Sequence, residues 1–177
     1  MGESVTVVGA GAVGLMALQA ARAGGASAVG VVEPLPERRR LAASLGADAV
    51  YAPEEGLEIG ADVVVECSGN PRAVGTAVTA ARKGGRVVLV GIYGHAGSFD
   101  FMDVVGSERE VIGSLSHVYD EDFAAAVNLL GRGAVRAEPL ISDRVPLRWA
   151  LDNGLLALMR EPEAHLKVVI EPNGGGA

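Results

Sequence analysis

The sequence predicts an α/β fold, in which a six-stranded parallel sheet is doubly wound and carries helices on both faces. Apolar, β-branched runs alternate with helical patterns through short links from the first residues to about Gly113. Two of these runs are continuous rather than alternating, which is typical of strands buried on both faces. Hydrophobic residues make up 49% of the 177 residues, enough for the buried core of one domain.

The expected elements follow from apolar periodicity and from helix start and stop signals. Strands are predicted at 4–8, 28–33, 48–51, 61–67, 86–91 and 110–116, with a last short strand at 167–170. Helices are predicted at 12–23, 36–45 and 71–83, then from Asp120 or Asp122 to about Leu130, and from Pro146 to about Arg160. The continuous runs at 61–67 and 86–91 belong in the middle of the sheet. One domain is therefore expected over 1–172, followed by a disordered, glycine-rich tail at 173–177.

The first strand runs directly into the pattern G-x-G-x-x-G, formed by Gly9, Gly11 and Gly14. Gly9 allows a tight turn, Gly11 lets the backbone approach a pyrophosphate, and Gly14 permits close packing of helix on strand. The helix that starts near Ala12 directs its free N–H groups at the same point. Glu33 closes the second strand, where its carboxylate can accept hydrogen bonds from an adenosine ribose. The pattern predicts a dinucleotide-binding Rossmann fold, and a glycine turn in another α/β protein is the alternative.

Charge and cysteine content restrict the partners. The net charge of −7 at pH 7 argues against nucleic acid, which requires a basic face. A single cysteine, Cys67, excludes an internal disulfide and favours a reducing compartment. We see no signal segment and no apolar stretch of about 20 residues, so no membrane association and a cytoplasmic location are expected. The basic cluster 38–40 is interpreted either as a solvated helix face or as a site where Arg38 contacts the adenosine end of a cofactor.

Six stretches, in order along residues 4–172, resemble the cofactor-binding half of the medium-chain, zinc-type alcohol and polyol dehydrogenases. That family includes sorbitol, threonine and butanediol dehydrogenases. The stretches are VTVVGAGAVG, GVVEPLPERRRLAASLGAD, ADVVVECSG, GGRVVLVGIYG, EREVIGS and HLKVVIEP. The resemblance implies NAD as the cofactor, and NADP is less expected because the carboxylate of Glu33 would repel a 2′-phosphate.

The resemblance also implies cofactor contacts, position by position. Glu33 stands where the family has its ribose-binding acid, and Arg38 where it has a basic residue beside that ribose. Lys167 falls where the family places a basic side chain near the pyrophosphate. Cys67 and Ser68 would line the cofactor cleft. The remaining implied contacts come from the glycine loop and, through the backbone, from the ends of the last two strands: Gly9, Gly11, Ala12, Val13, Gly14, Val90, Ile92, Ser114 and Ser116.

The chain departs from the family in one large respect, because the N-terminal catalytic half that supplies the zinc ligands is absent. One cysteine and three scattered histidines, His95, His117 and His165, show no metal-ligand spacing, so we expect no zinc site. His95 and His117 could relay a proton, but loop histidines without a catalytic role are the favoured interpretation, and no catalytic residue is assigned. The expected function is that of the NAD-binding domain of an alcohol or polyol dehydrogenase. Its parent enzyme transfers hydride between a secondary alcohol and NAD, and the domain alone is inactive.

Two alternatives stay open. The chain could be a non-catalytic module that senses NAD(H), or a separate subunit completed by a catalytic partner chain. A homodimer through the sheet edge is also expected, with Ser98–Ser116 as the exposed edge because Phe99 and Phe101 alternate.

Overall fold

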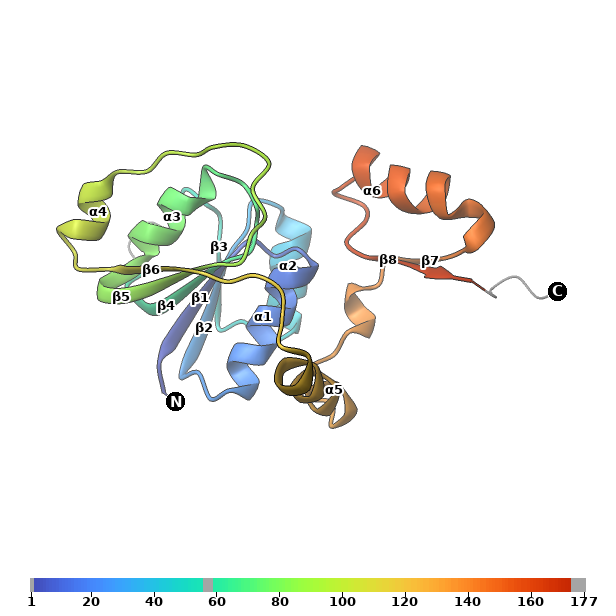
Figure 1. Ribbon diagram of the computed structural model, residues 1–177, viewed down its shortest axis with the longest axis horizontal. Helices are drawn as coiled ribbons and strands as arrows, with labels where there is room; N and C mark the ends of the chain where they lie inside the picture. Colours follow the sequence, from blue (N-terminus) through green and yellow to red (C-terminus); the bar gives the residue numbers. More distant parts are fainter. Residues whose placement is uncertain (1, 56–58, 173–177) are drawn as a thin grey trace. The chain divides into compact units, whose positions relative to one another are not determined.

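The computed structural model of the protein describes residues 2–55 and 59–172. Contacts among these residues separate two compact units, one ending at Val135 and the other beginning at Arg136 (Figure 1). Each unit is described by itself. The sequence predicts one domain over 1–172, and this division into contact units does not test that prediction. The tail expected at 173–177 lies outside the described residues.

The first unit is built on the six-stranded parallel sheet that the sequence predicts. Its strands are β1 (Ser4–Val8), β2 (Ala28–Val32), β3 (Ala49–Tyr51), β4 (Ala61–Glu66), β5 (Ala81–Leu89) and β6 (Glu110–Gly113). They lie in the order β3-β2-β1-β4-β5-β6, and each neighbouring pair is parallel. From β1 the sheet grows outward through β2 to β3, and from β4 it grows in the opposite direction through β5 to β6. The junction between β1 and β4 is therefore the switch point of a Rossmann sheet. The predicted fold class is confirmed.

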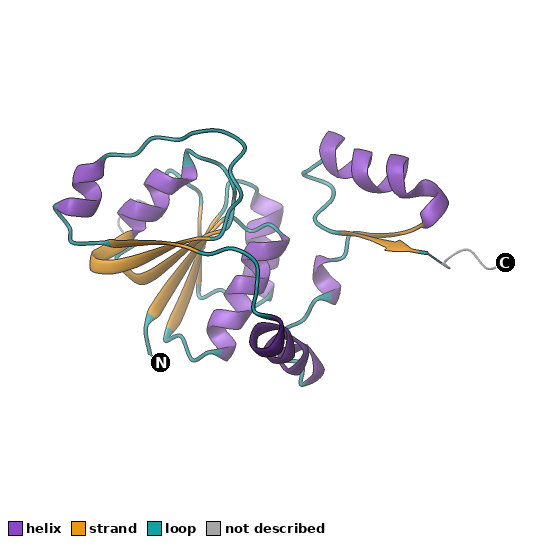
Figure 2. Cartoon of the chain, in the orientation of Figure 1, coloured by secondary structure: helices purple, strands orange, loops and turns teal. Residues whose placement is uncertain are grey.

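Helices cover both faces of this sheet (Figure 2). The first two, α1 (Ala12–Ala23) and α2 (Pro36–Ser44), connect the strands on one side of the switch point. On the other side, α3 (Ala73–Ala80) connects β4 to β5. Because such crossovers are right-handed and the two halves wind in opposite directions, α3 lies on the face opposite to α1 and α2.

The core lies between the sheet and these helices. Val64 of β4 and Val87 of β5 have no exposed surface, and they belong to one apolar cluster with Ala77 and Val78 of α3. Small side chains on α3 let the helix approach the strands closely, and each buried valine stabilises the fold by about 1.5 kcal/mol or more. The core therefore holds the carboxyl ends of β1, β4 and β5 side by side.

Two local predictions are corrected. The helix predicted over 71–83 ends at Ala80, because Ala81 is extended and pairs with Ala61 as the start of β5. The alternation at Phe99 and Phe101 does not form a strand. Instead, the short helix α4 (Phe101–Val105) begins here, because the Asp100 carboxylate accepts a hydrogen bond from the backbone N–H of Met102 (2.8 Å).

The exposed edge of the sheet is β6. All four of its residues are exposed, and β5 is its only neighbour in the sheet. After β6, a π-helical turn, η1 (Tyr119–Phe123), leads into α5 (Ala124–Gly131). These two elements agree with the helix predicted from Asp120 or Asp122 to about Leu130. None of the described helices is both long and apolar enough to cross a membrane.

The second unit contains a pair of parallel strands, β7 (Asp143–Pro146) and β8 (Val168–Glu171). Between them run η3 (Leu147–Trp149), η4 (Ala150–Leu156) and α6 (Ala157–Arg160), which together fill the predicted helical stretch. A single turn, η2 (Glu138–Leu140), precedes β7. The sequence predicts β8 but not β7. This four-residue strand begins with two charged residues and ends in proline, and so lacks the apolar pattern of a strand.

Candidate cofactor site

The glycine loop follows β1 at the switch point, and packing inside the protein requires two of its three glycines. Gly9 has a φ of +95°, in the left-handed region, and a Cβ on it would lie 2.9 Å from Ser68 after β4. A Cβ on Gly14 would lie 1.8 Å from the carbonyl oxygen of Gly9, so only glycine allows α1 to begin this close to the loop. The tight turn at Gly9 and the close packing at Gly14 are confirmed.

Gly11 differs from the other two glycines. A Cβ on it would meet no atom within 4 Å, so nothing inside the described protein requires glycine here. Gly11 directly precedes α1, and no side chain caps the first turn of this helix. The first N–H groups of a helix carry partial positive charge and bind phosphate oxygens. The backbone of Gly11, Ala12 and Val13 can therefore be approached by a pyrophosphate, whereas their contact with a cofactor stays a prediction.

Glu33 directly follows β2 and is only 4% exposed. One carboxylate oxygen, Oε2, accepts a hydrogen bond from the backbone N–H of Ala10 (2.7 Å), and Oε1 accepts one from Leu35 (3.0 Å). The carboxylate therefore links the glycine loop to the turn between β2 and α2. A carboxylate has about four acceptor positions, so two backbone hydrogen bonds leave capacity for ribose hydroxyls. The predicted ribose contact is thus chemically available, although the sequence did not reveal the linking role.

The basic cluster at the start of α2 divides into different roles. Arg39 donates from Nη1 to the carbonyl oxygens of Glu33 (2.6 Å) and Pro34 (2.7 Å), which holds its guanidinium at the end of β2. Arg40 pairs with Glu37 on the solvated face of the helix. Arg38 is half-buried, and its contact with the adenosine ribose stays a prediction.

The loop after β4, residues 67–72, lies next to the glycine loop. The backbone N–H of Cys67 donates to the carbonyl oxygen of Val8 at the end of β1 (2.8 Å). Burial, with a smaller contribution from the negative charge of Glu66, raises the pKa of the Cys67 thiol to about 12. A thiol that is neutral at physiological pH is a poor nucleophile and a poor metal ligand. Cys67 is thus a small, half-buried and unreactive side chain at the end of β4, and its contact with a cofactor, like that of Ser68, stays a prediction.

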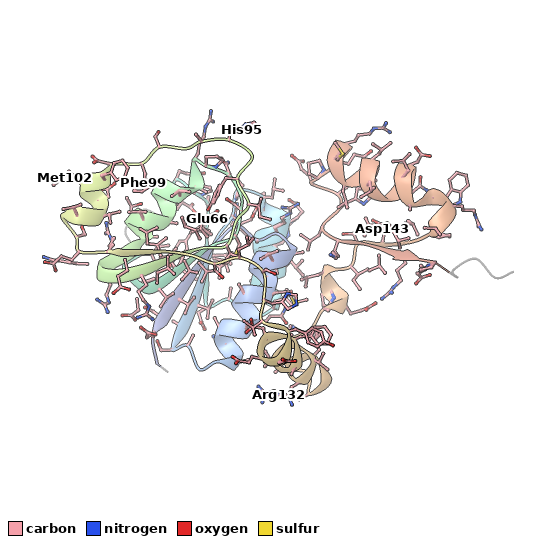
Figure 3. The ribbon with its side chains drawn as sticks, in the orientation of Figure 1. Glu66, His95, Phe99, Met102, Arg132 and Asp143 are labelled. Carbon is pink, nitrogen blue, oxygen red and sulfur yellow. The ribbon has the colours of Figure 1, made fainter. Side chains whose placement is uncertain are left out.

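Glu66, the last residue of β4, is fully buried. Its carboxylate accepts hydrogen bonds from the backbone N–H of Ser68 (2.8 Å), from the Ser68 hydroxyl and from the Tyr93 hydroxyl. Its backbone carbonyl accepts hydrogen bonds from Val90 (2.9 Å) and Gly91 (3.0 Å). Glu66 therefore joins the loop after β4 to the loop after β5, residues 90–100. In Figure 3 it lies among the strands of the first unit, inward from the part of this loop that carries His95.

Sequence reasoning missed Glu66 and Tyr93. Glu66 was included in a continuous apolar run, and Tyr93 was given no role. A signal was present, because a buried carboxylate inside an apolar strand is costly unless it is hydrogen-bonded. Every buried side-chain nitrogen or oxygen among the described residues does have a hydrogen-bond partner. One partner of Glu66, Tyr93, comes from the end of a different strand, which the local pattern does not identify.

The ends of β5 and β6 complete the same edge of the sheet. The Ile92 side chain is 80% exposed, and a Cβ on Gly69 would lie only 2.8 Å from its carbonyl oxygen. Ser114 continues the ladder of β6 by donating to a β5 carbonyl oxygen (2.9 Å). Ser116 has a φ of +65°, a left-handed conformation that costs a non-glycine residue about 1 kcal/mol. The contacts of Val90, Ile92, Ser114 and Ser116 with the nicotinamide carboxamide stay predictions.

The remaining candidates are the three histidines and Lys167, and His95 lies in the loop after β5 at this edge. His95 and His117 are exposed loop residues of the first unit. Lys167 and His165 belong to the second unit, where His165 Nδ1 lies 2.6 Å from Asp143 Oδ2. The predicted contact of Lys167 with a pyrophosphate stays a prediction. Within residues 2–55 and 59–172, no three His, Cys, Asp or Glu side chains lie close enough together to hold a metal ion.

Comparison with known proteins identifies relatives over nearly the whole chain. The family model for zinc-binding dehydrogenases matches residues 12–132. The (R,R)-butanediol dehydrogenase of Bacillus subtilis is 30% identical over 181 aligned residues, which cover 97% of this chain and 51% of that protein. The chain spans about half the length of the curated relatives that it matches.

Solved structures agree with the sequence relatives. L-idonate 5-dehydrogenase from Escherichia coli K-12 matches with a TM-score of 0.86 and 28% identity, over 96% of this chain and 50% of that one. A proposed zinc-binding dehydrogenase from Sinorhizobium meliloti 1021, bound to NADP, matches with a TM-score of 0.83 and 30% identity, over 97% and 53%.

The sheet order, the glycine loop at the switch point and the family match all indicate a cofactor-binding domain of the dehydrogenase type. The family model covers α1 to the end of α5, including the loops after β2, β4 and β5. The chain belongs to the zinc-binding dehydrogenase family and represents the cofactor-binding domain of a zinc-type medium-chain dehydrogenase.

Proposed function

We propose that the first unit binds NAD(H) across the carboxyl ends of β1 and β4 and serves hydride transfer in an alcohol or polyol dehydrogenase. The observation that carries the proposal is the contrast among the three glycines. Gly9 and Gly14 are required by packing, whereas a Cβ on Gly11 would meet nothing within the described protein. An approaching pyrophosphate accounts for glycine at this position.

Each end of the cofactor has suitable partners. The pyrophosphate would bind the backbone of Gly11 and the first turn of α1, and Glu33 would accept hydrogen bonds from the adenosine ribose. When bound, NAD⁺ supplies the hydride acceptor at its nicotinamide ring. A 2′-phosphate would face the buried carboxylate of Glu33, which favours NAD over NADP. The NADP bound to the S. meliloti relative makes this preference a point to test.

We expect this chain alone not to oxidise an alcohol. Catalysis by the family needs zinc to polarise the substrate oxygen, and the described residues hold no suitable group of ligands. The complete reaction, which we propose to be the oxidation of a secondary alcohol or polyol, would then require a catalytic half. That half could belong to the same polypeptide or to a partner chain.

Calorimetric titration of the chain with NAD⁺, NADH and NADPH tests the proposal. We expect NADH to bind about tenfold or more tightly than NADPH, because the second phosphate meets a buried charge. Glu33→Ala should weaken NADH binding by about tenfold or more, since a hydrogen bond to a charged group contributes about 1.5–3 kcal/mol. The matched control is Glu37→Ala, which removes an exposed carboxylate from the same helix start and should leave NADH affinity unchanged. Failure of the unmodified chain to bind any of the three at millimolar concentration would contradict the proposal.

The exposed edge strand β6 remains our candidate for pairing with a second copy. Its Val111 and Ile112 are 37% and 41% exposed. Light scattering should show a dimer that Ile112→Lys converts to a monomer, and a monomer at high concentration of the unmodified chain would contradict this expectation.

A further inference from the structure

The carboxylate of Glu66 takes no part in the cofactor contacts proposed above, yet it has no exposed surface and accepts three hydrogen bonds. All three donors, in Ser68 and Tyr93, are neutral. Burying a carboxylate without a cation costs free energy that an apolar residue at the end of a strand would not. Packing alone therefore does not account for a glutamate at this position.

The two loops joined by Glu66 pack tightly around its carboxylate. A Cβ on Gly91 would lie 2.5 Å from Glu66 Oε2 and 2.6 Å from the backbone nitrogen of Gly69. A Cβ on Gly69 would in turn lie 2.8 Å from the carbonyl oxygen of Ile92. Because no Cβ fits at either glycine, the two loops pack closely against each other, and Gly91 packs closely against the Glu66 carboxylate.

These loops belong to the half of the sheet that lies across the switch point from Glu33. In a doubly wound sheet each half binds one mononucleotide of a dinucleotide. Glu33, at the end of β2, is the candidate partner of the adenosine ribose. The loops after β4 and β5 therefore face the nicotinamide mononucleotide.

We propose that Glu66 is a positioning residue for the nicotinamide half of the site. Its hydrogen bonds to Ser68 and Tyr93 hold the loop after β5, and with it the backbone of Val90 and Ile92, in the conformation that receives the nicotinamide. The inference rests on the proposed NAD(H) binding. Burial and the hydrogen bond to Glu66 raise the pKa of Tyr93, so its hydroxyl stays protonated and donates at any physiological pH.

The test compares NADH with ADP-ribose, which lacks the nicotinamide ring. Both affinities are measured on the unmodified chain, on Glu66→Gln and on Tyr93→Phe. We expect each variant to lose about tenfold in NADH affinity, the effect of one lost hydrogen bond to a charged group. ADP-ribose affinity should change less than about twofold. The double variant should lose little more than Glu66→Gln alone, because both substitutions break the same connection.

Val29→Ala is the matched control, because Val29 of β2 is fully buried and does not belong to the apolar cluster against which Tyr93 packs. It should lower stability yet leave the ratio of the two affinities unchanged. Equal losses of NADH and ADP-ribose affinity in Glu66→Gln and Tyr93→Phe would show a merely structural role and overturn the inference alone. If Glu66→Gln does not fold, Tyr93→Phe decides by the same criterion. Failure of the unmodified chain to bind both ligands would overturn the proposed function, and the inference with it.

Discussion

Two buried glutamates stand at strand ends in the two halves of the sheet. Glu33 follows β2 in the first half, and Glu66 ends β4 in the second. Each carboxylate is at most 4% exposed and joins two loops at the carboxyl edge. Glu33 accepts hydrogen bonds from two backbone N–H groups, whereas Glu66 accepts them from a backbone N–H and two side-chain hydroxyls.

Because their hydrogen-bond partners differ, the two glutamates can contribute to a binding site in two different ways. Glu33 shapes the backbone of the glycine loop and keeps acceptor positions for a ligand. Glu66 is enclosed by protein, and its three hydrogen bonds all serve the loops themselves. One glutamate can therefore contact the cofactor directly, while the other acts through the loops that it holds.

The largest expected effect comes from substitutions in the glycine loop, to which Glu33 is hydrogen-bonded. Gly14→Ala places a Cβ 1.8 Å from the carbonyl oxygen of Gly9, so α1 must move away from the loop. We expect a loss of about 3 kcal/mol in the free energy of unfolding, or failure to fold, measured by urea denaturation. Gly11→Ala is the control, with a loss of less than about 1 kcal/mol but weaker NADH binding. Equal stability losses in both variants would contradict the distinction among the glycines.

The next effect compares the glutamates themselves. Glu66→Ala should lower the free energy of unfolding by about 2 kcal/mol or more, because it leaves buried donors without an acceptor and opens a cavity. Glu33→Ala should cost less, about 1–2 kcal/mol, since it leaves two donors without an acceptor rather than three. Urea denaturation of both variants at pH 7 measures the difference. A greater loss for Glu33→Ala would reverse the assignment of the enclosed role to Glu66.

A smaller effect follows from Cys67, which lies between the halves. Its pKa is raised from 9.0 to about 12 in the folded protein. Below pH 9 the thiol is neutral in both states, and its contribution to stability is complete. As pH rises from 9 towards 12, only the unfolded chain deprotonates, so this contribution is progressively lost. Urea denaturation at pH 8 and pH 10.5 should show a smaller fall for Cys67→Ala than for the unmodified chain, and equal falls would contradict the raised pKa.

The smallest effect concerns the amino ends of the strands, where one carboxylate contacts strands of both halves of the sheet. Asp62 at the start of β4 accepts hydrogen bonds from Arg82 (2.6 Å) and from Ser4, which hold its pKa well below 3.8. Its stabilisation is therefore present above pH 3.8 and is lost as pH falls further. Asp62→Asn should flatten this acid-induced loss while leaving NADH affinity unchanged. Weaker NADH binding would mean that the carboxyl-edge loops do not by themselves determine the site.

Much of the fold follows from local sequence. The β-branched run before Gly9 and the spacing to Glu33 predict a strand, a turn and a second strand end. The largely apolar runs at 61–67 and 86–91 predict central strands, because strands covered on both faces lack the regular alternation of apolar and polar residues. The predictions failed where apolar periodicity was weak or misleading, as at Phe101, where the cap at Asp100 starts a helix instead of a strand.

The sequence by itself determined the order of the elements and the position of the glycine loop, because periodicity and turn chemistry are local properties. The tertiary structure alone decided which buried groups meet. Tyr93 reaches Glu66 from a different strand end, and Ala10 and Leu35 meet at Glu33. Such contacts depend on the alignment of parallel strands, and parallel neighbours are separated along the chain by a whole crossover. The residues that shape this site are therefore adjacent in the sheet but distant in the sequence.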